Sequence, residues 1–149
     1  MKKDSVFFRL AALCLALLFV CPVQVGAVEP RASDYLTSYN AYPYSAGGGK
    51  IQIWFNVTGD DYMDDIGSLS IEIYESTDNS NWTWVDSFTN GNTPSMLGHN
   101  EIIYQSHVDY QGVVGRYYRA YICIYAGKDG GGDTRYFWTT STKATLFAA

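Results

Sequence analysis

The sequence predicts an all-β fold, namely a single two-sheet antiparallel β-sandwich of about seven strands. Short runs of alternating apolar and polar residues predict this class, because a strand that buries one face has a period of two. Gly, Asn, Asp and Pro separate these runs and are the residues that turns require. After Ser33 the sequence contains no sustained apolar period of 3.6 residues, so no long helix is expected there.

A charged and then apolar segment precedes this predicted domain. Lys2-Lys3 and Arg9 come before an apolar stretch over residues 10–20, and the small residues of Val25-Gly26-Ala27 follow. This order is typical of a secretory signal peptide, and the stretch is shorter than the ~20 residues that span a bilayer. We therefore expect a signal peptide over residues 1–27, a lead-in over 28–33 and the β-sandwich domain over 34–149, secreted into the extracellular space without a membrane anchor.

The predicted mature chain is acidic and almost free of cysteine. Cleavage after Ala27 would leave 122 residues with 7 basic and 14 acidic side chains. This balance disfavours binding to nucleic acid, whose phosphates are neutralised by Lys and Arg, and to anionic membranes. Cys123 alone would remain, so no disulfide can form within the mature chain. Its thiol either pairs between chains or packs within a strand as a small apolar side chain.

The first two strands are predicted on either side of a glycine turn. One strand covers residues 35–42, and Pro43 suits a sheet edge because proline cannot donate a ladder hydrogen bond. Gly47-Gly48-Gly49 supplies the turn. The next strand, over residues 51–57, has apolar residues at every second position, so one of its faces is buried.

A hairpin is predicted in the middle of the chain. An acidic loop over residues 60–65 leads into a strand over 69–74, in which Leu, Ile and Ile alternate with polar residues. The turn residues at 78–81 reverse the chain into a further strand over 82–88.

The clearest strand lies in the last third of the chain. A loop over residues 89–100 and a weakly alternating strand over 101–109 precede it. The strand itself covers residues 116–126. A glycine-rich turn over 129–133 then permits a hairpin to a final strand over 134–140. Within residues 116–126, one face holds Tyr118, Ala120, Ile122 and Ile124, and the other holds Tyr117, Arg119, Tyr121, Cys123 and Tyr125.

The closing strands resemble those of immunoglobulin-like and fibronectin type III-like sandwiches. Tyr118-x-Ala120-x-Ile122-x-Ile124, followed by Gly127 and a hairpin, carries this resemblance. In those folds a tyrosine early in this strand turns its hydroxyl back onto nearby backbone, and Tyr118 holds the matching position. Ile51-x-Ile53-x-Phe55 resembles their second strand. The chain departs from the pattern because it lacks a cysteine pair between the sheets and because Trp54 is one residue out of phase with the buried aromatic.

The chain also resembles a family of small secreted proteins of unknown function from clostridia-like Gram-positive bacteria. The resemblance spans residues 31–143 and implies export and a β-sandwich, but no activity. Three stretches carry it, namely residues 31–36 (RASDYL), 75–80 (ESTDNS) and 132–138 (GDTRYFW).

Aromatic residues are in excess, with 13 tyrosines and 4 tryptophans. Because an unpaired charge is not left in a core, Arg119 should face solvent together with the tyrosines in phase with it. Such rings could bind a protein or stack on a cell-surface glycan, or tyrosine could simply suit half-buried strand positions. The predicted binding residues are Tyr74, Trp82, Trp84, Tyr117, Arg119, Tyr121 and Tyr125.

No catalytic residues and no cofactor are predicted. His99 and His107 are the two histidines, and no nucleophile-elbow motif accompanies them. The acidic loop could hold calcium through Asp60, Asp61, Asp64 and Asp65, although the spacing of an EF-hand is absent; the alternative is a solvated acidic turn. We therefore expect a non-catalytic surface recognition or protein-interaction module, with a carbohydrate-binding module as the alternative and a small secreted hydrolase as the third possibility.

Overall fold

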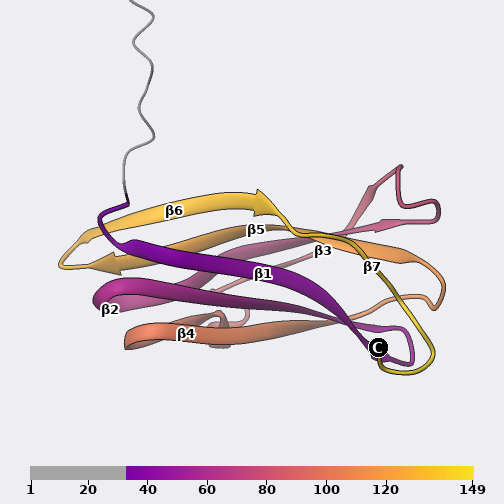
Figure 1. The fold of residues 1–149 in the computed structure, drawn as a ribbon, viewed down its shortest axis with the longest axis horizontal. Coiled ribbons are helices and arrows are strands. Elements are labelled where there is room, and N and C mark those ends of the chain that lie inside the picture. Colours follow the sequence, from indigo (N-terminus) through magenta and orange to yellow (C-terminus); the bar gives the residue numbers. More distant parts are fainter. Residues whose placement is uncertain (1–32) are drawn as a thin grey trace, which may run out of the picture. The chain divides into compact units, whose positions relative to one another are not determined.

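The computed structural model describes residues 33–149, so the predicted signal peptide and nearly all of the lead-in lie outside the described residues. Within this range no helix is long and apolar enough to cross a membrane. Seven antiparallel strands form the fold (Figure 1), which confirms the prediction of an all-β antiparallel class. They are β1 (Leu36–Gly47), β2 (Lys50–Ser76), β3 (Thr83–Thr89), β4 (Leu97–Gln111), β5 (Tyr117–Lys128), β6 (Gly131–Trp138) and β7 (Thr142–Lys143), with a short 3-10 helix, η2 (Pro94–Met96), before β4.

β2 is the central strand, and its 27 residues include both predicted strands, over 51–57 and 69–74, together with the segment between them. Its first half pairs with β1 and β4, and its second half pairs with β3 and β5. The prediction of an acidic loop over residues 60–65 is therefore wrong. Such a loop would have divided β2 into two strands. The chain stays extended there, and the β2–β4 register jumps from Thr58↔Ile103 to Met63↔Glu101. The extra residues form a bulge that bends the strand instead of ending it.

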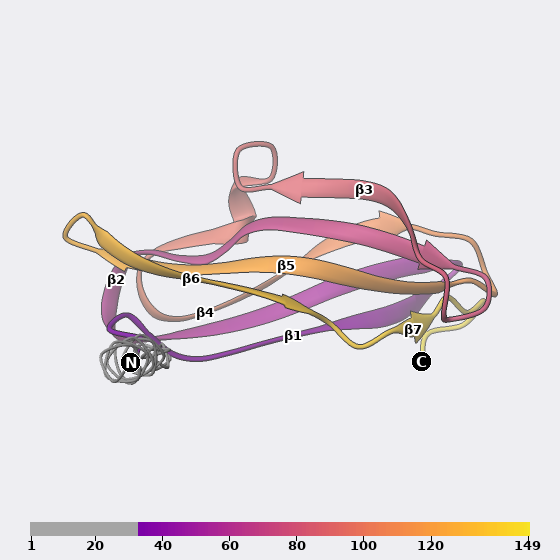
Figure 2. The same ribbon diagram turned by 90° about the horizontal axis from the view of Figure 1, so that it is seen from above.

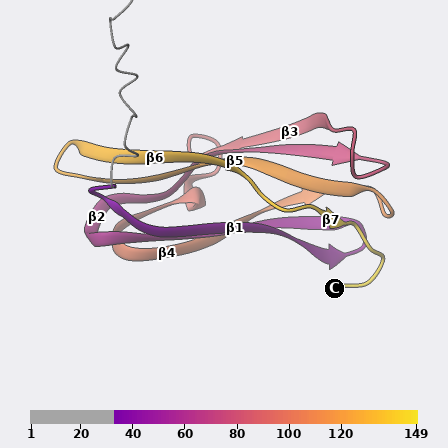
Figure 3. The ribbon, with the colours of Figure 1, turned by 45° about the horizontal axis from the view of Figure 1, so that its top comes forward.

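The bend in β2 curls the sheet around one core. β1, β4 and the first half of β2 lie on one side of this core, and β3, β5, β6 and the second half of β2 lie on the other (Figure 3). Figure 2 shows β3, β2, β5 and β6 side by side on the second side. The strands predicted to form two sheets are thus joined in one, because β2 belongs to both sides. Fully buried side chains fill the space between them, including Ile51, Ile53, Phe55, Ile71, Ile73, Ile122 and Ile124.

The hairpin between β5 and β6 is tighter than the sequence indicated. Lys128 pairs with Gly131, which leaves a two-residue turn of Asp129 and Gly130. Both turn residues have positive φ, at 54° and 79°. These values are typical of the type I′ turn, whose twist matches that of a hairpin. As a result β6 begins at Gly131, three residues before the predicted start.

Tyr118 makes the backbone contact that the resemblance implied. Its hydroxyl accepts a hydrogen bond of 2.8 Å from the N–H of Val113 and donates one of 2.7 Å to Glu75 Oε2. Arg116 pairs with the same carboxylate. Burial, and secondarily the contact with Glu75, raises the pKa of Tyr118 to about 12.

Several tyrosines cover glycines, which accounts for part of the tyrosine excess. A Cβ added at each of these glycines would lie within 3 Å of ring or hydroxyl atoms. An aromatic ring laid over a strand glycine supplies the packing that the missing side chain cannot. The pairs are Tyr35 over Gly131, Tyr104 over Gly98, Tyr118 over Gly112, and Tyr125 over Gly127 and Gly132.

Candidate functional site

The candidate site lies on the outer face of the β3–β2–β5–β6 side of the sheet. Ala120, Ile122 and Ile124 point into the core and are fully buried, whereas Arg119 and Tyr121, which alternate with them, are half-buried. The expected orientation of β5 is therefore confirmed. We call the outward-facing cluster on these strands the aromatic face; it consists of Tyr74, Trp82, Trp84, Arg119, Tyr121, Tyr136 and Trp138.

Strand register brings these side chains together. Tyr74 of β2 is directly opposite Arg119 of β5 and, on its other side, opposite Trp84 of β3. Tyr121 is opposite Trp138 of β6. Directly opposed residues in an antiparallel pair have Cβ atoms about 4.5–5.5 Å apart, so these side chains are neighbours across the strands.

Arg119 is at the centre of the aromatic face. Its guanidinium carbon lies 4.4 Å from the ring centroid of Trp82 and 4.1 Å from that of Trp138, so two indoles enclose it. A guanidinium over an indole is attracted by the ring quadrupole. Arg119 Nε is buried and has no hydrogen-bond partner among the described residues. Among the described residues Arg119 forms no ion pair, so stacking on the indoles holds this cation.

Further ring contacts connect Trp138 to other members of the aromatic face. Tyr121 lies 5.0 Å from Trp138 and stacks on Tyr136 at 6.0 Å, and Tyr74 meets the edge of Trp138 at 4.9 Å. The Tyr74 hydroxyl donates to Glu72 Oε2 at 2.9 Å, and this bond raises the pKa of Tyr74. The outer parts of the cluster remain accessible, since Tyr136 is 61% and Trp138 is 44% exposed.

A turn capped by Asp78 holds Trp82 in place. The carboxylate of Asp78 accepts hydrogen bonds from the backbone N–H groups of Ser80 and Asn81, at 2.9 and 2.8 Å, and from the side chain of Asn81 at 2.7 Å. The bonds from Asn81 and Ser80 hold the pKa of Asp78 well below its ordinary value. Trp82 follows this turn directly, just before β3 begins, and the turn positions its indole against Arg119.

Asp78→Ala is expected to loosen this turn, to lower Tm modestly and to weaken the near-UV circular dichroism of the tryptophans. Because the folded-state pKa is depressed, the stabilisation by Asp78 is present above its ordinary pKa of 3.8 and is lost as pH falls through the depressed value. The Tm difference between the wild type and the variant should therefore be constant near neutral pH and shrink below about pH 4.

Thermal unfolding at several pH values measures this difference. Asp60→Ala is the matched control, because Asp60 is exposed and its carboxylate makes no hydrogen bond within residues 33–149. An equal Tm loss in both variants would contradict the role of the Asp78 turn.

The structure brings together most of the predicted binding residues but not all of them. Tyr74, Trp82, Trp84, Arg119 and Tyr121 share the aromatic face. Tyr117 instead lies under Lys143 of β7, at 5.3 Å, and Tyr125 covers two glycines of the β5–β6 hairpin.

Tyr136 and Trp138 also belong to the aromatic face, although the sequence pattern did not lead us to predict them. The alternation Thr134-x-Tyr136-x-Trp138 would have indicated that these residues share one face, but their position beside Arg119 and Tyr121 depends on the β5–β6 register.

Cys123 lies beneath this cluster. It is opposite Tyr136 and only 2% exposed, and burial raises the pKa of its thiol. A buried thiol with a raised pKa is a poor nucleophile for disulfide exchange. The position supports the interpretation of Cys123 as a small apolar strand residue.

The aspartates of the predicted acidic loop do not converge on one point. Asp61 pairs with Lys128 at 2.6 Å, and Asp64 accepts a hydrogen bond of 2.8 Å from the N–H of Asp129. Asp65 lies 2.6 Å from His99. Among the described residues no three His, Cys, Asp or Glu side chains are arranged to hold a metal ion. The calcium hypothesis therefore gains no geometric support.

The two histidines occupy different parts of the fold. His99 pairs with Asp65 at the start of β4, whereas the ring of His107 stacks on Trp54 at 4.2 Å. Each histidine is thus engaged separately, and the two do not form a shared acid–base site.

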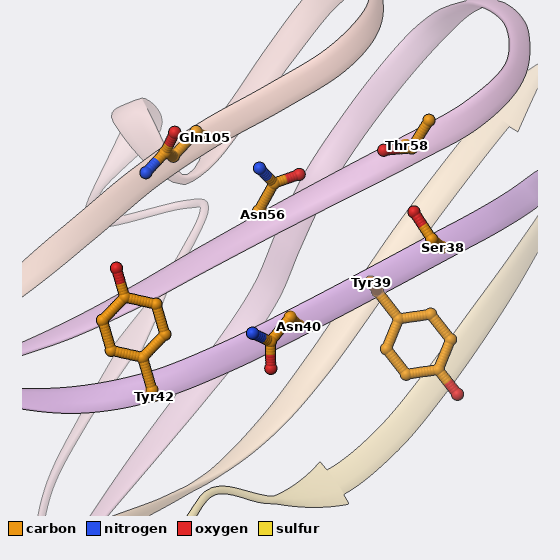
Figure 4. A pocket seen from close by; sticks show the side chains of 7 residues that line it. All are labelled: Ser38, Tyr39, Asn40, Tyr42, Asn56, Thr58 and Gln105. Atoms are coloured by element: carbon orange, nitrogen blue, oxygen red, sulfur yellow. The ribbon is translucent and has the colours of Figure 1, made fainter.

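A second surface, which was not predicted, lies on the outer face of β1, β4 and the first half of β2. Seven uncharged side chains line a hollow of about 410 Å³ on β1, β2 and β4 (Figure 4). They are Ser38, Tyr39, Asn40, Tyr42, Asn56, Thr58 and Gln105. Trp54 and His107 lie beside this hollow, because Trp54 is opposite Tyr42 and His107 in the register. The alternation in β2 implied that Trp54 faces outward, but its neighbours depend on non-local pairing.

The comparisons with known proteins show no family for this chain. No family model and no curated protein matches the sequence. One solved structure with some likeness is a family 76 glycoside hydrolase from a bovine Bacteroides thetaiotaomicron strain, with 18% identity and a TM-score of 0.32. The match covers 74% of this chain and 20% of the hydrolase chain. A likeness this distant carries no inference about activity.

Proposed function

We propose that the protein is an exported, non-catalytic recognition module that binds a partner protein through the aromatic face. The observation that carries this proposal is the enclosure of Arg119 between Trp82 and Trp138, with further rings around it. Trp, Tyr and Arg are the residue types most enriched among those that dominate the energy of protein interfaces.

The rigidity of the aromatic face also supports a role in binding. The ring of Tyr121 contacts those of Tyr136 and Trp138, and the Tyr74 hydroxyl is fixed by its hydrogen bond to Glu72. Side chains that are already fixed lose less conformational entropy when a partner covers them. A row of stacked rings on a sheet therefore offers a large contact area at a low ordering cost.

The proposal includes the fold of the protein and its location outside the cell. An immunoglobulin-like or fibronectin type III-like sandwich is supported by the bond between Tyr118 and the backbone of Val113. Secretion is supported by the leader sequence over residues 1–27. The partner of such a module would be an exported protein or a protein of the cell envelope.

Tyr121→Ala and Trp138→Ala are each expected to reduce capture of the partner at least tenfold while lowering Tm by only a few degrees. The immobilised protein is incubated with culture fluid and solubilised cell envelope from the organism that produces it. Captured proteins are then quantified by mass spectrometry. Only a protein captured reproducibly by the wild type counts as the partner.

Tyr62→Ala is the matched control, since Tyr62 is 55% exposed on β2 and lies outside the aromatic face. It should retain full capture. If the wild type captures no protein, or if Tyr121→Ala and Trp138→Ala capture it as well as Tyr62→Ala does, the proposed function is wrong.

A further inference from the structure

The outer face of β1, β4 and the first half of β2 is organised in rows. Asn40, Asn56 and Gln105 are opposite one another on three adjacent strands. On one side of this row lie Ser38 and Thr58, and on the other lie Tyr42, Trp54 and His107. We call this surface the amide face; it consists of Ser38, Asn40, Tyr42, Trp54, Asn56, Thr58, Gln105 and His107.

The middle row of the amide face has free hydrogen-bonding capacity. The side chains of Asn40, Asn56 and Gln105 are exposed, and none of them bonds to another protein group within residues 33–149. Figure 4 shows these amides on three neighbouring strands, with Tyr42 at one end of the hollow. Each amide offers two donor hydrogens and one acceptor oxygen. This row is therefore suited to groups that both donate and accept hydrogen bonds.

The aromatic row beside the amides is held rigid. Trp54 stacks on His107 at 4.2 Å, and its Nε1–H donates to Gln52 Oε1 at 3.0 Å. Gln52 in turn donates to Asp109 Oδ1 at 2.9 Å. This chain of contacts fixes the indole on the sheet. Tyr42, opposite Trp54, is 44% exposed and adds a second ring.

We propose that the amide face binds an uncharged saccharide chain. A sugar hydroxyl is both donor and acceptor, which matches the amide row, and the apolar face of a sugar ring packs against an aromatic ring. Successive rows are two residues apart along a strand, or ~6.6 Å, so the three rows span ~13 Å. This length accommodates a chain of sugars better than a single ring.

Other ligand classes fit the amide face less well. The hollow has no charged lining residue, and the nearby Asp109 is already engaged by Gln52 and lies 4.0 Å from Lys50. An anionic ligand would therefore find no cation in the hollow. An extended peptide gains its affinity from an unpaired strand edge and from apolar side-chain pockets, whereas this surface is the polar face of paired strands.

The test is a titration of the purified protein with four neutral polysaccharides, namely xylan, mannan, dextran and hydroxyethyl cellulose, and with polygalacturonate as an anionic counterpart. Calorimetry should show saturable binding to at least one neutral polysaccharide and none to polygalacturonate. Asn56→Ala and Tyr42→Ala should each lower the association constant at least tenfold. Both side chains are exposed, so the variants should keep the wild-type Tm.

Tyr121→Ala on the aromatic face is the matched control and should bind the polysaccharide like the wild type. Conversely, Asn56→Ala should capture the partner protein normally, so failure of this inference is distinguishable from failure of the proposed function. The inference is overturned if none of the four neutral polysaccharides binds, if polygalacturonate binds better, or if Asn56→Ala and Tyr42→Ala bind as the wild type does. A loss of polysaccharide binding in Tyr121→Ala would also overturn it, because the sugar would then lie on the aromatic face.

Discussion

Gly67→Ala is expected to destabilise the protein by about 4 kcal/mol. Gly67 lies in β2 with a φ of +145°, a value that side chains of L-residues rarely adopt. A Cβ at this position would lie 2.2 Å from the carbonyl oxygen of Met96, which is backbone and cannot swing away. Backbone strain and overpacking each cost about 1–3 kcal/mol, and the total approaches the whole stability of a small domain.

The effect of Gly67→Ala is measured as the shift in the denaturation midpoint at equilibrium. Gly91→Ala is the matched control, because Gly91 is exposed and a Cβ there would be 3.7 Å from its nearest neighbour, the hydroxyl of Thr89. The control should be nearly neutral. A Gly67→Ala protein with a wild-type midpoint would show that β2 and η2 do not approach each other as described.

Tyr118→Ala is expected to cost about 3–5 kcal/mol, the usual range for removing a fully buried ring. Tyr118 is completely buried, and its ring packs on Gly112 while its hydroxyl bonds to Val113 and Glu75. Tyr118→Phe separates the two contributions. It keeps the ring but leaves the Val113 N–H and the Glu75 carboxylate short of a partner, which costs about 1–3 kcal/mol.

The Tyr118→Phe variant also has a pH signature. The pKa of Tyr118 is raised from 10.0 to about 12 in the folded state, so its stabilisation is complete below pH 10 and is lost as pH rises toward 12. The difference in stability between the wild type and Tyr118→Phe should therefore shrink over this alkaline window. Denaturant titrations at pH 8 and above measure it, and a difference that does not vary with pH would contradict the assigned hydroxyl contacts.

Some elements of this protein follow from patterns that are local in the chain. In β5, alternation predicted that Ile122 and Ile124 face the core and that Arg119 and Tyr121 face outward; the two isoleucines are fully buried, and Arg119 and Tyr121 are half-buried. The predicted hairpin between β5 and β6 also forms, although its turn is the Asp-Gly pair at 129–130 and not the predicted residues 129–133, because a type I′ turn depends on the φ preferences of two residues. These features are legible in the sequence since each depends on a few consecutive residues.

The acidic segment of β2 shows where such local patterns mislead. Four aspartates within six residues are typical of a loop, yet residues 60–65 remain extended. Met63 within this segment and Ile66 directly after it are buried, and β4 pairs with β2 on both sides of the bend. Burial of these two apolar side chains and pairing with a distant strand outweigh the weak strand propensity of aspartate, because strand propensity depends strongly on context.

The two candidate binding surfaces also combine features that are local in the sequence with features that depend on strand pairing. Composition and alternation predicted an outward-facing stripe of Arg119 and tyrosines, but they could not separate its members by role. Tyr125 covers glycines, whereas Tyr121 joins the cluster around Trp138. The amide face was not anticipated at all, because Asn40, Asn56 and Gln105 are far apart in the chain and meet through the β1–β2–β4 register. Period-two alternation is a property of one strand and can be read from its residues, whereas the neighbours of a side chain across a sheet depend on which strands pair and in what register.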